Sequence, residues 1–245
     1  MIQSVVKSVF AYAKALTIIN TLKLWKYFVI PILISVFTAI VIISLAYTFS
    51  GDIGSYIKTI WKWDFGKETF GVVSTFISGL LILALGLILY KHIIMALSAP
   101  FMSPVSEKIE KHLLGDKHEH RRTTNTEQLV RGIRINVRNL LKELFFTIPI
   151  LMLGFIPVIG IVSSILLFFM QSFYAGFGNM DYTLERHFSY KESLSFVQRN
   201  KGIAIGNGIG FVLLSLIPII GIIIVLPLSV TSATTETVKR IQEEL

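Results

Sequence analysis

Residues 144–180 form an unbroken stretch without a single Asp, Glu, Lys, Arg or His, and this stretch constrains the fold more than any other feature of the chain. One bilayer crossing takes about 20 apolar residues, so the stretch is too long for one crossing and too short for two with a turn. Pro157 and Gly160 lie near its middle, where proline removes a backbone donor and glycine frees the backbone angles. We therefore predict a re-entrant helical hairpin that enters and leaves the membrane on one side.

The same pattern recurs in residues 202–235, which are again uncharged and carry Pro218 and Gly221 near their middle. This repeat predicts a second re-entrant hairpin. Irregular backbone at membrane depth is tolerated only where it is buried in protein or lines a water-filled cavity. The two hairpin tips, Pro157, Gly160, Pro218 and Gly221, are therefore candidate pathway residues. The alternative is a closed, packed hairpin that only fits a short helix into the bilayer.

Composition assigns the chain to the integral membrane proteins, because 53% of its residues are hydrophobic, 16% are charged and the mean hydropathy is +0.69. Solid apolar runs broken by Pro and Gly favour helices over a β-barrel, whose strands would alternate in polarity. The basic residues that give the net charge of +8 lie beside apolar spans. This placement favours contact with anionic lipid headgroups over nucleic acid. The absence of cysteine excludes disulfides and thiolate metal sites.

We expect one all-α membrane domain over residues 1–245. Residues 1–26 predict an amphipathic interfacial helix, because Lys7 and Lys14 share a face opposite an apolar one. Residues 27–48 and 70–90 predict the two long transmembrane helices. Residues 91–143, the longest polar stretch, predict cytoplasmic and interfacial helices that lead into the first hairpin. The hairpins of residues 144–180 and 202–235 complete the domain.

The distribution of Lys and Arg predicts the orientation of the chain. Residues 50–69 carry three of them, whereas residues 91–143 carry ten. Two full spans and two re-entrant hairpins would place the strongly basic segments together on one side. By the positive-inside rule those segments and both termini are cytoplasmic, and residues 50–69 face outward.

Lys23, Trp25 and Lys26 precede the first long span and form a candidate anion-binding site. The N-terminus of the helix that follows presents free amides and a partial positive charge, to which the two lysines add full charges. The competing interpretation is a membrane anchor, because Lys beside an interfacial Trp commonly contacts lipid phosphates.

Nothing in the sequence predicts catalysis, a cofactor or a metal site. The uncharged runs lack an acid, a base or a His for proton chemistry, so we expect that the protein is not an enzyme. His118 and His120 are two residues apart, which is not the spacing that places two His on one helix face. A nucleotide-binding G-x-x-x-x-G-K loop is absent, so passive flux is favoured over direct ATP drive.

Short pieces in order along the chain resemble the CysZ sulfate-permease family and its distant relatives in the etoposide-induced membrane-protein group. The pieces are Phe28-Val29-Ile30-Pro31, Ala99-Pro100-Phe101 with Ser106-Glu107-Lys108, Phe155-Ile156-Pro157-Val158-Ile159-Gly160, Asp181-Tyr182, and Ile217-Pro218 with Ser232-Ala233-Thr234. The resemblance implies a bacterial inner-membrane protein with two long spans and two hemi-penetrating hairpins. It also implies a homo-oligomer that passes sulfate inward for cysteine synthesis.

The chain departs from this family just before the first span. CysZ-like proteins carry there a Gly, an aliphatic residue and two Arg associated with sulfate binding, whereas this chain reads Lys23-Leu24-Trp25-Lys26. Arg binds an oxyanion through a planar fork and Lys is a point charge, so the change weakens geometric selection for sulfate. The leading hypothesis is a channel-like transporter of sulfate or a similar small anion. The alternative is a non-transporting membrane scaffold of the same fold.

Overall fold

The structure is a computed structural model that describes residues 1–58, 67–115, 123–154, 159–217 and 220–244, and every regular element in these residues is an α-helix. The elements are α1 (Ile2–Thr21), α2 (Trp25–Lys58), α3 (Lys67–Leu114), α4 (Asn125–Gly154), α5 (Ile159–His187), α6 (Tyr190–Arg199), α7 (Lys201–Ser215) and α8 (Ile220–Glu244). Within the described residues, four helical segments are long and apolar enough to cross a membrane: Ile2–Thr21, Trp25–Asp52, Leu85–Leu114 and Ile159–His187. The chain is thus an all-α membrane protein, as predicted.

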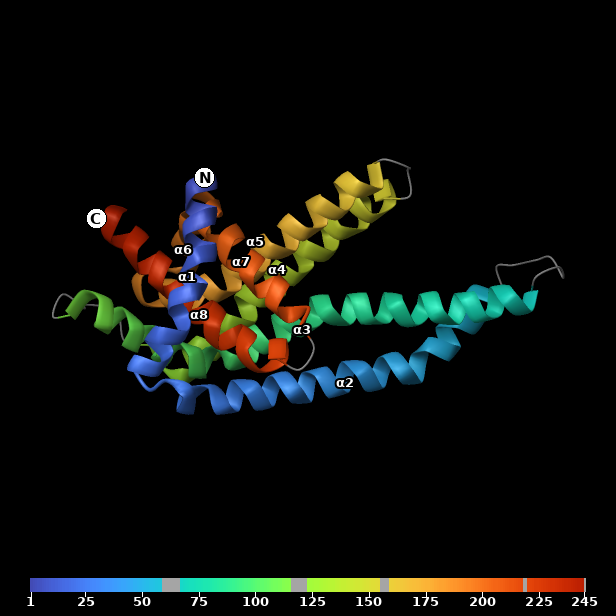
Figure 1. The fold of residues 1–245 in the computed structure, drawn as a ribbon, viewed down its shortest axis with the longest axis horizontal. Coiled ribbons are helices and arrows are strands. Elements are labelled where there is room, and N and C mark those ends of the chain that lie inside the picture. The colour runs from blue at the N-terminus through green and yellow to red at the C-terminus, as the bar shows by residue number, and fades with distance from the viewer. Residues whose placement is uncertain (59–66, 116–122, 155–158, 218–219, 245) are drawn as a thin grey trace.

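Helices α2 and α3 form a long pair that projects from the rest of the protein (Figure 1). Gly86 permits their close approach, because a Cβ atom there would lie 2.4 Å from Cγ2 of Ile42. Both helices are longer than the spans predicted for them, and α3 continues through Pro100 and Pro104. Helix α3 therefore continues past the change in polarity at Lys91, and the polar side chains of Lys91, His92, Ser98, Ser103, Ser106 and Glu110 are buried.

Helices α4 and α5 form a second pair whose far end points to the same side as the α2–α3 pair (Figure 1). Helix α4 ends at Gly154 and α5 begins at Ile159, so the predicted tip residue Gly160 lies in the first turn of α5. Gly160 permits the start of α5 to contact the end of α4, because a Cβ atom there would lie 2.8 Å from the carbonyl oxygen of Gly154. Pro157 lies outside the described residues.

The break between α7 and α8 is built in the same way. Gly221 lies against the end of α7, where an added Cβ atom would be 2.3 Å from the carbonyl oxygen of Leu214. Pro218 lies outside the described residues. In both pairs glycine serves the close approach of two helices. That either pair re-enters the membrane remains a prediction.

Helix α7 is the centre of the packing, because its glycines meet two neighbouring helices. A Cβ atom on Gly208 would lie 1.6 Å from the carbonyl oxygen of Ser172 in α5. On another face, Gly206 and Gly210 meet α1, where Cβ atoms would lie 2.4 Å from the carbonyl oxygen of Val5 and from Cε2 of Tyr12. Small residues let the helix backbones approach closely in this way. The glycine spacing along α7 thus determines which helices surround it.

Helix α1 is amphipathic, and it also packs against the protein. Ser8, Ala11, Ala15 and Ile19 are buried in its contact with α7 and α8. Ile2, Val6, Phe10 and Leu16 are exposed. In Figure 1, α1 runs steeply across the direction of α2, and both termini lie on the side opposite the ends of the α2–α3 and α4–α5 pairs. Because α1 is also long and apolar enough to cross a membrane, its interfacial placement remains a prediction.

Candidate functional site

Lys23 lies in a tight turn between α1 and α2. Its φ of 52° is in the left-handed region. The N–H of Lys23 donates to the carbonyl of Asn20 at 3.1 Å, and the N–H of Leu24 donates to that of Ile19 at 3.0 Å. The side chain of Trp25 donates from Nε1 to Oδ1 of Asn20 at 2.7 Å. Glycine adopts a left-handed helix terminus without a Cβ penalty, so the family's Gly at the position of Lys23 has a backbone reason.

We expect Lys23→Gly to stabilise the protein by about 1 kcal/mol, because it removes the cost of a left-handed non-glycine residue. Lys23→Ala is the control, since it removes the same charge and keeps the Cβ atom. The thermal midpoint of the detergent-solubilised protein, followed by size-exclusion chromatography, compares the two. A stabilisation that is equal in both variants would assign the effect to the charge and contradict the backbone explanation.

Lys26 lines a cavity of about 530 Å³ between the start of α2, the proline segment of α3 and the first turn of α4. We call it the Lys26 cavity, and its lining residues are Lys26, Tyr27, Ile30, Pro100, Phe101, Pro104, Asn125, Thr126 and Leu129. The ammonium groups of Lys26 and Lys108 each lie 5.3 Å from the centre of the Tyr27 ring. Within the described residues, neither lysine has a carboxylate within ion-pair distance. The cavity lining therefore includes one lysine without a carboxylate partner, Lys26, and a second such lysine, Lys108, lies against its lining residue Tyr27.

The structure separates the other predicted site residues from this cavity. Lys23 and Trp25 belong to the preceding turn and do not line it. Gly160 and Gly221 lie at the ends of the two hairpins, and α5, α7 and α8 contribute no lining residue. Ile30 and Pro100 are brought together, although they come from separate pieces of the family pattern.

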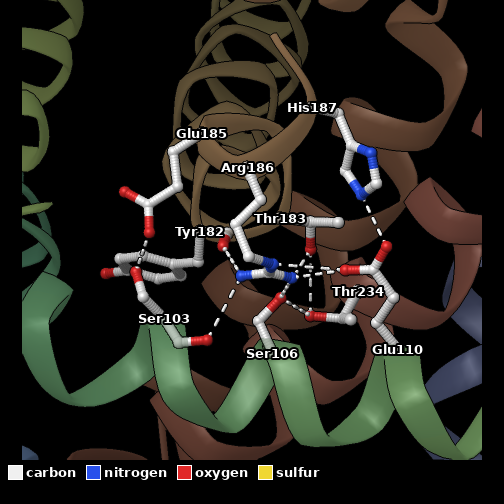
Figure 2. Close-up of polar contacts among 9 residues, drawn as sticks. All are labelled: Ser103, Ser106, Glu110, Tyr182, Thr183, Glu185, Arg186, His187 and Thr234. Carbon is white, nitrogen blue, oxygen red and sulfur yellow. Dashed lines mark hydrogen bonds and ion pairs between the residues drawn. The ribbon is translucent and has the colours of Figure 1, made fainter. Parts of the chain in front are cut away.

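Arg186 is the centre of a buried polar cluster between α3 and α5 (Figure 2). The side chains of Arg186 and Glu110 are 2% and 1% exposed. The guanidinium donates to Oε2 of Glu110 from Nε at 3.2 Å and from Nη2 at 2.7 Å. Its Nη1 donates to the carbonyls of Tyr182 at 2.7 Å and Ser103 at 3.2 Å. On the other side of the carboxylate, Nε2 of His187 lies 2.5 Å from Oε1.

Three hydroxyl groups join α3, α5 and α8 beside this guanidinium (Figure 2). The hydroxyl oxygens of Ser106 and Thr183 are 2.8 Å apart. The hydroxyl oxygen of Thr234 lies 3.0 Å from that of Ser106 and 3.2 Å from that of Thr183. Ser106 also accepts from Nη2 of Arg186 at 2.9 Å. Each of the five guanidinium N–H donors thus has an acceptor in the protein. Arg186 therefore joins helices and has no donor left for a ligand.

Arg131 and Asp181 form a second ion pair, between α4 and α5. The guanidinium donates from Nε at 3.1 Å and from Nη2 at 2.8 Å to the two carboxylate oxygens. It also donates to the carbonyl of Phe188 and to the hydroxyl of Ser193. Burial alone would lower the pKa of Arg131, but the carboxylates of Asp181 and Glu185 together outweigh burial and raise it. The guanidinium of Arg131, like that of Arg186, is therefore bound by groups of the protein itself.

The third buried pair joins Lys91 of α3 to Glu143 of α4. Nζ of Lys91 lies 2.6 Å from Oε1 of Glu143, and Nε2 of His92 lies 2.9 Å from Oε2. All three side chains are buried. This group was not predicted, because residues 91–143 were expected to form cytoplasmic and interfacial helices. A signal was present in the sequence: Lys91 directly follows one long apolar run and Glu143 directly precedes another, and these positions lie within α3 and α4, which are in contact.

Two groups of basic residues near these clusters differ in their partners. Arg186 and Lys91 are buried, Arg131 is partly buried, and carboxylates neutralise all three. Lys26 in the lining of the Lys26 cavity, and Lys108 against the ring of Tyr27, are exposed. An incoming anion would meet the second group without displacing an internal carboxylate. In the part of the chain that the structure describes, no three His, Asp or Glu side chains gather as a metal site, and His118 and His120 lie outside that part.

Comparison with known proteins identifies the family. No curated protein matches the chain. The family described as "Sulfate transporter CysZ/Etoposide-induced protein 2.4" matches residues 11–225. The matched region includes α2 to α7, and with them the Lys26 cavity and the Arg186, Arg131 and Lys91 pairs. The chain therefore belongs to the sulfate transporter CysZ/etoposide-induced protein 2.4 family.

Proposed function

We propose that the protein passes sulfate, or a similar small oxyanion, across a bacterial inner membrane by a channel-like route. The observation that carries the proposal is two lysines without a carboxylate partner, Lys26 in the cavity lining and Lys108 against the ring of the lining residue Tyr27, where two pieces of the family pattern meet. We further propose that the protein acts as a homo-oligomer in sulfate assimilation, with cytoplasmic termini.

The chemistry of the Lys26 cavity suits an anion in transit. Lysine ammonium groups attract a doubly charged oxyanion as point charges, without the two-pronged geometry of arginine. Conduction requires a site that is favourable enough to enter and weak enough to leave. Two exposed lysines without a carboxylate partner would attract an anion without enclosing it. The loss of the family's Arg pair is therefore expected to lower selectivity for sulfate more than it lowers the capacity to carry anions.

Sulfate binding to the purified protein tests this site. We expect saturable binding by isothermal titration calorimetry, weakened about five-fold by Lys26→Ala and by Lys108→Ala, since one lysine contributes about 1 kcal/mol near a surface. Lys111→Ala is the control, because Lys111 is exposed on the same helix as Lys108 but, unlike Lys108, has no recorded contact with the ring of the lining residue Tyr27. If wild type binds neither sulfate nor another small oxyanion at millimolar concentration, the scaffold alternative replaces the transporter.

A further inference from the structure

A second basic cavity, of about 740 Å³, lies between the first turns of α1, the junction of α6 and α7, and the end of α8. We propose that this cavity binds the phosphate headgroup of an anionic lipid. Its lining includes six basic side chains and two acidic ones. The basic residues are Lys7, Lys14, Arg199, Lys201, Lys239 and Arg240, and the acidic residues are Glu236 and Glu243. It shares no residue with the Lys26 cavity, and the proposal stands whether or not the protein carries sulfate.

Three of the six basic side chains have no internal counter-charge. Ion pairs hold the other three: Arg199 with Glu244 at 3.4 Å, Lys239 with Glu236 at 2.7 Å and Arg240 with Glu243 at 2.9 Å. Within the described residues, Lys7, Lys14 and Lys201 have no carboxylate within ion-pair distance. Like charges that gather around one cavity repel each other, so an anion that enters it lowers the electrostatic energy.

The N-terminus of α7 adds to this positive charge. Lys201, Gly202 and Ile203 of its first turn line the cavity. The side chain of Asn200 does not cap the helix. Its Nδ2 donates to the carbonyl of Phe196 and to Glu244, and its Oδ1 accepts from Arg240. The partial positive charge of the helix end is thus directed at the cavity without a capping oxygen.

Exposed apolar side chains beside the lysines distinguish a lipid from free phosphate. Val6 and Phe10 line the cavity and are 46% and 70% exposed, and Ile2 on the same helix is 77% exposed. A soluble anion gains nothing from these side chains. A lipid places its headgroup among the lysines while its acyl chains cover the apolar residues. Helix α1 thus presents lysines without a carboxylate partner, Lys7 and Lys14, beside exposed apolar side chains, and this combination favours a lipid.

Native mass spectrometry of the detergent-solubilised full chain tests the proposal with phosphatidylglycerol and, as the uncharged reference, phosphatidylcholine. We expect wild type to bind phosphatidylglycerol in preference to phosphatidylcholine. The double variant Lys7→Gln/Lys201→Gln should weaken phosphatidylglycerol binding about 30-fold, because each lysine near an anionic surface contributes about 1 kcal/mol. Lys191→Gln is the matched control, since Lys191 is exposed on α6 and lies outside the cavity.

Two results would overturn the assignment. Equal binding of phosphatidylglycerol by the double variant and by Lys191→Gln would mean that the cavity does not recognise the headgroup. Displacement of the lipid by millimolar inorganic phosphate would assign the cavity to a soluble anion. Sulfate binding measured on the same double variant separates this proposal from the transport function, because the Lys26 cavity is intact in it.

Discussion

Gly208→Ala is expected to destabilise the protein by about 3 kcal/mol or more and to reduce sharply the yield of folded, monodisperse protein. The added Cβ atom would lie 1.6 Å from the carbonyl oxygen of Ser172. The clash is with backbone in the middle of α5, so a change of side-chain rotamer cannot relieve it. Gly176→Ala meets the same obstacle from the other helix, because its Cβ atom would lie 1.8 Å from the carbonyl oxygen of Ala204.

Gly51→Ala is the matched control for this substitution. Gly51 is also helical, and a Cβ atom there would have nothing within 4 Å. Alanine is favoured over glycine in a helix by about 1 kcal/mol, so the control is expected to be neutral or stabilising. Size-exclusion chromatography after extraction and the thermal midpoint measure both variants. If Gly208→Ala behaves like Gly51→Ala, then α5 and α7 do not pack at the distance described.

Arg186→Leu is the second substitution with a large expected effect. It removes the guanidinium from the Glu110 carboxylate, which is 1% exposed. Breaking one partner of a buried ion pair costs about 3–5 kcal/mol, because the remaining charge stays desolvated. We therefore expect a strong fall in the thermal midpoint. The double variant Arg186→Leu/Glu110→Leu should recover part of the loss, since it removes both charges.

An exposed ion pair provides the comparison for Arg186. The side chain of Arg199 is 57% exposed and lies 3.4 Å from Glu244. Arg199→Leu is expected to cost less than about 1 kcal/mol, since exposed pairs contribute little. A similar midpoint for Arg186→Leu and Arg199→Leu would contradict the burial of the Arg186 cluster. Failure of the double variant to recover any stability would show that the hydroxyl groups around Arg186 matter more than its charge.

The sequence could mark residues where helices meet, because proline and glycine act on the backbone of their own residues. Of the predicted tip residues, Gly160 and Gly221 lie at the starts of α5 and α8, each against the end of the preceding helix. The close contacts of α7 also have a local signal: Gly202, Gly206 and Gly210 follow at intervals of four and share one helix face. Sequence analysis did not use that signal.

The polar clusters could not be predicted in the same way, because their partners are distant along the chain. Arg186 and Glu110 are 76 residues apart, and Ser106 and Thr234 are 128 apart. No periodicity or spacing relates such positions. The sequence shows the departure of Lys23 from the family pattern only as a change of charge. The structure adds that this position has a left-handed backbone, which the sequence does not reveal.

Uptake of radiolabelled sulfate into proteoliposomes tests the central claim most directly. The comparison is between wild type, the double variant Lys26→Ala/Lys108→Ala and the control Lys111→Ala, with a sulfate gradient and without ATP or a proton gradient. We predict saturable uptake by wild type and by the control, and strongly reduced uptake by the double variant. Folded wild-type protein that gives no sulfate-dependent flux under this gradient would contradict the proposed function.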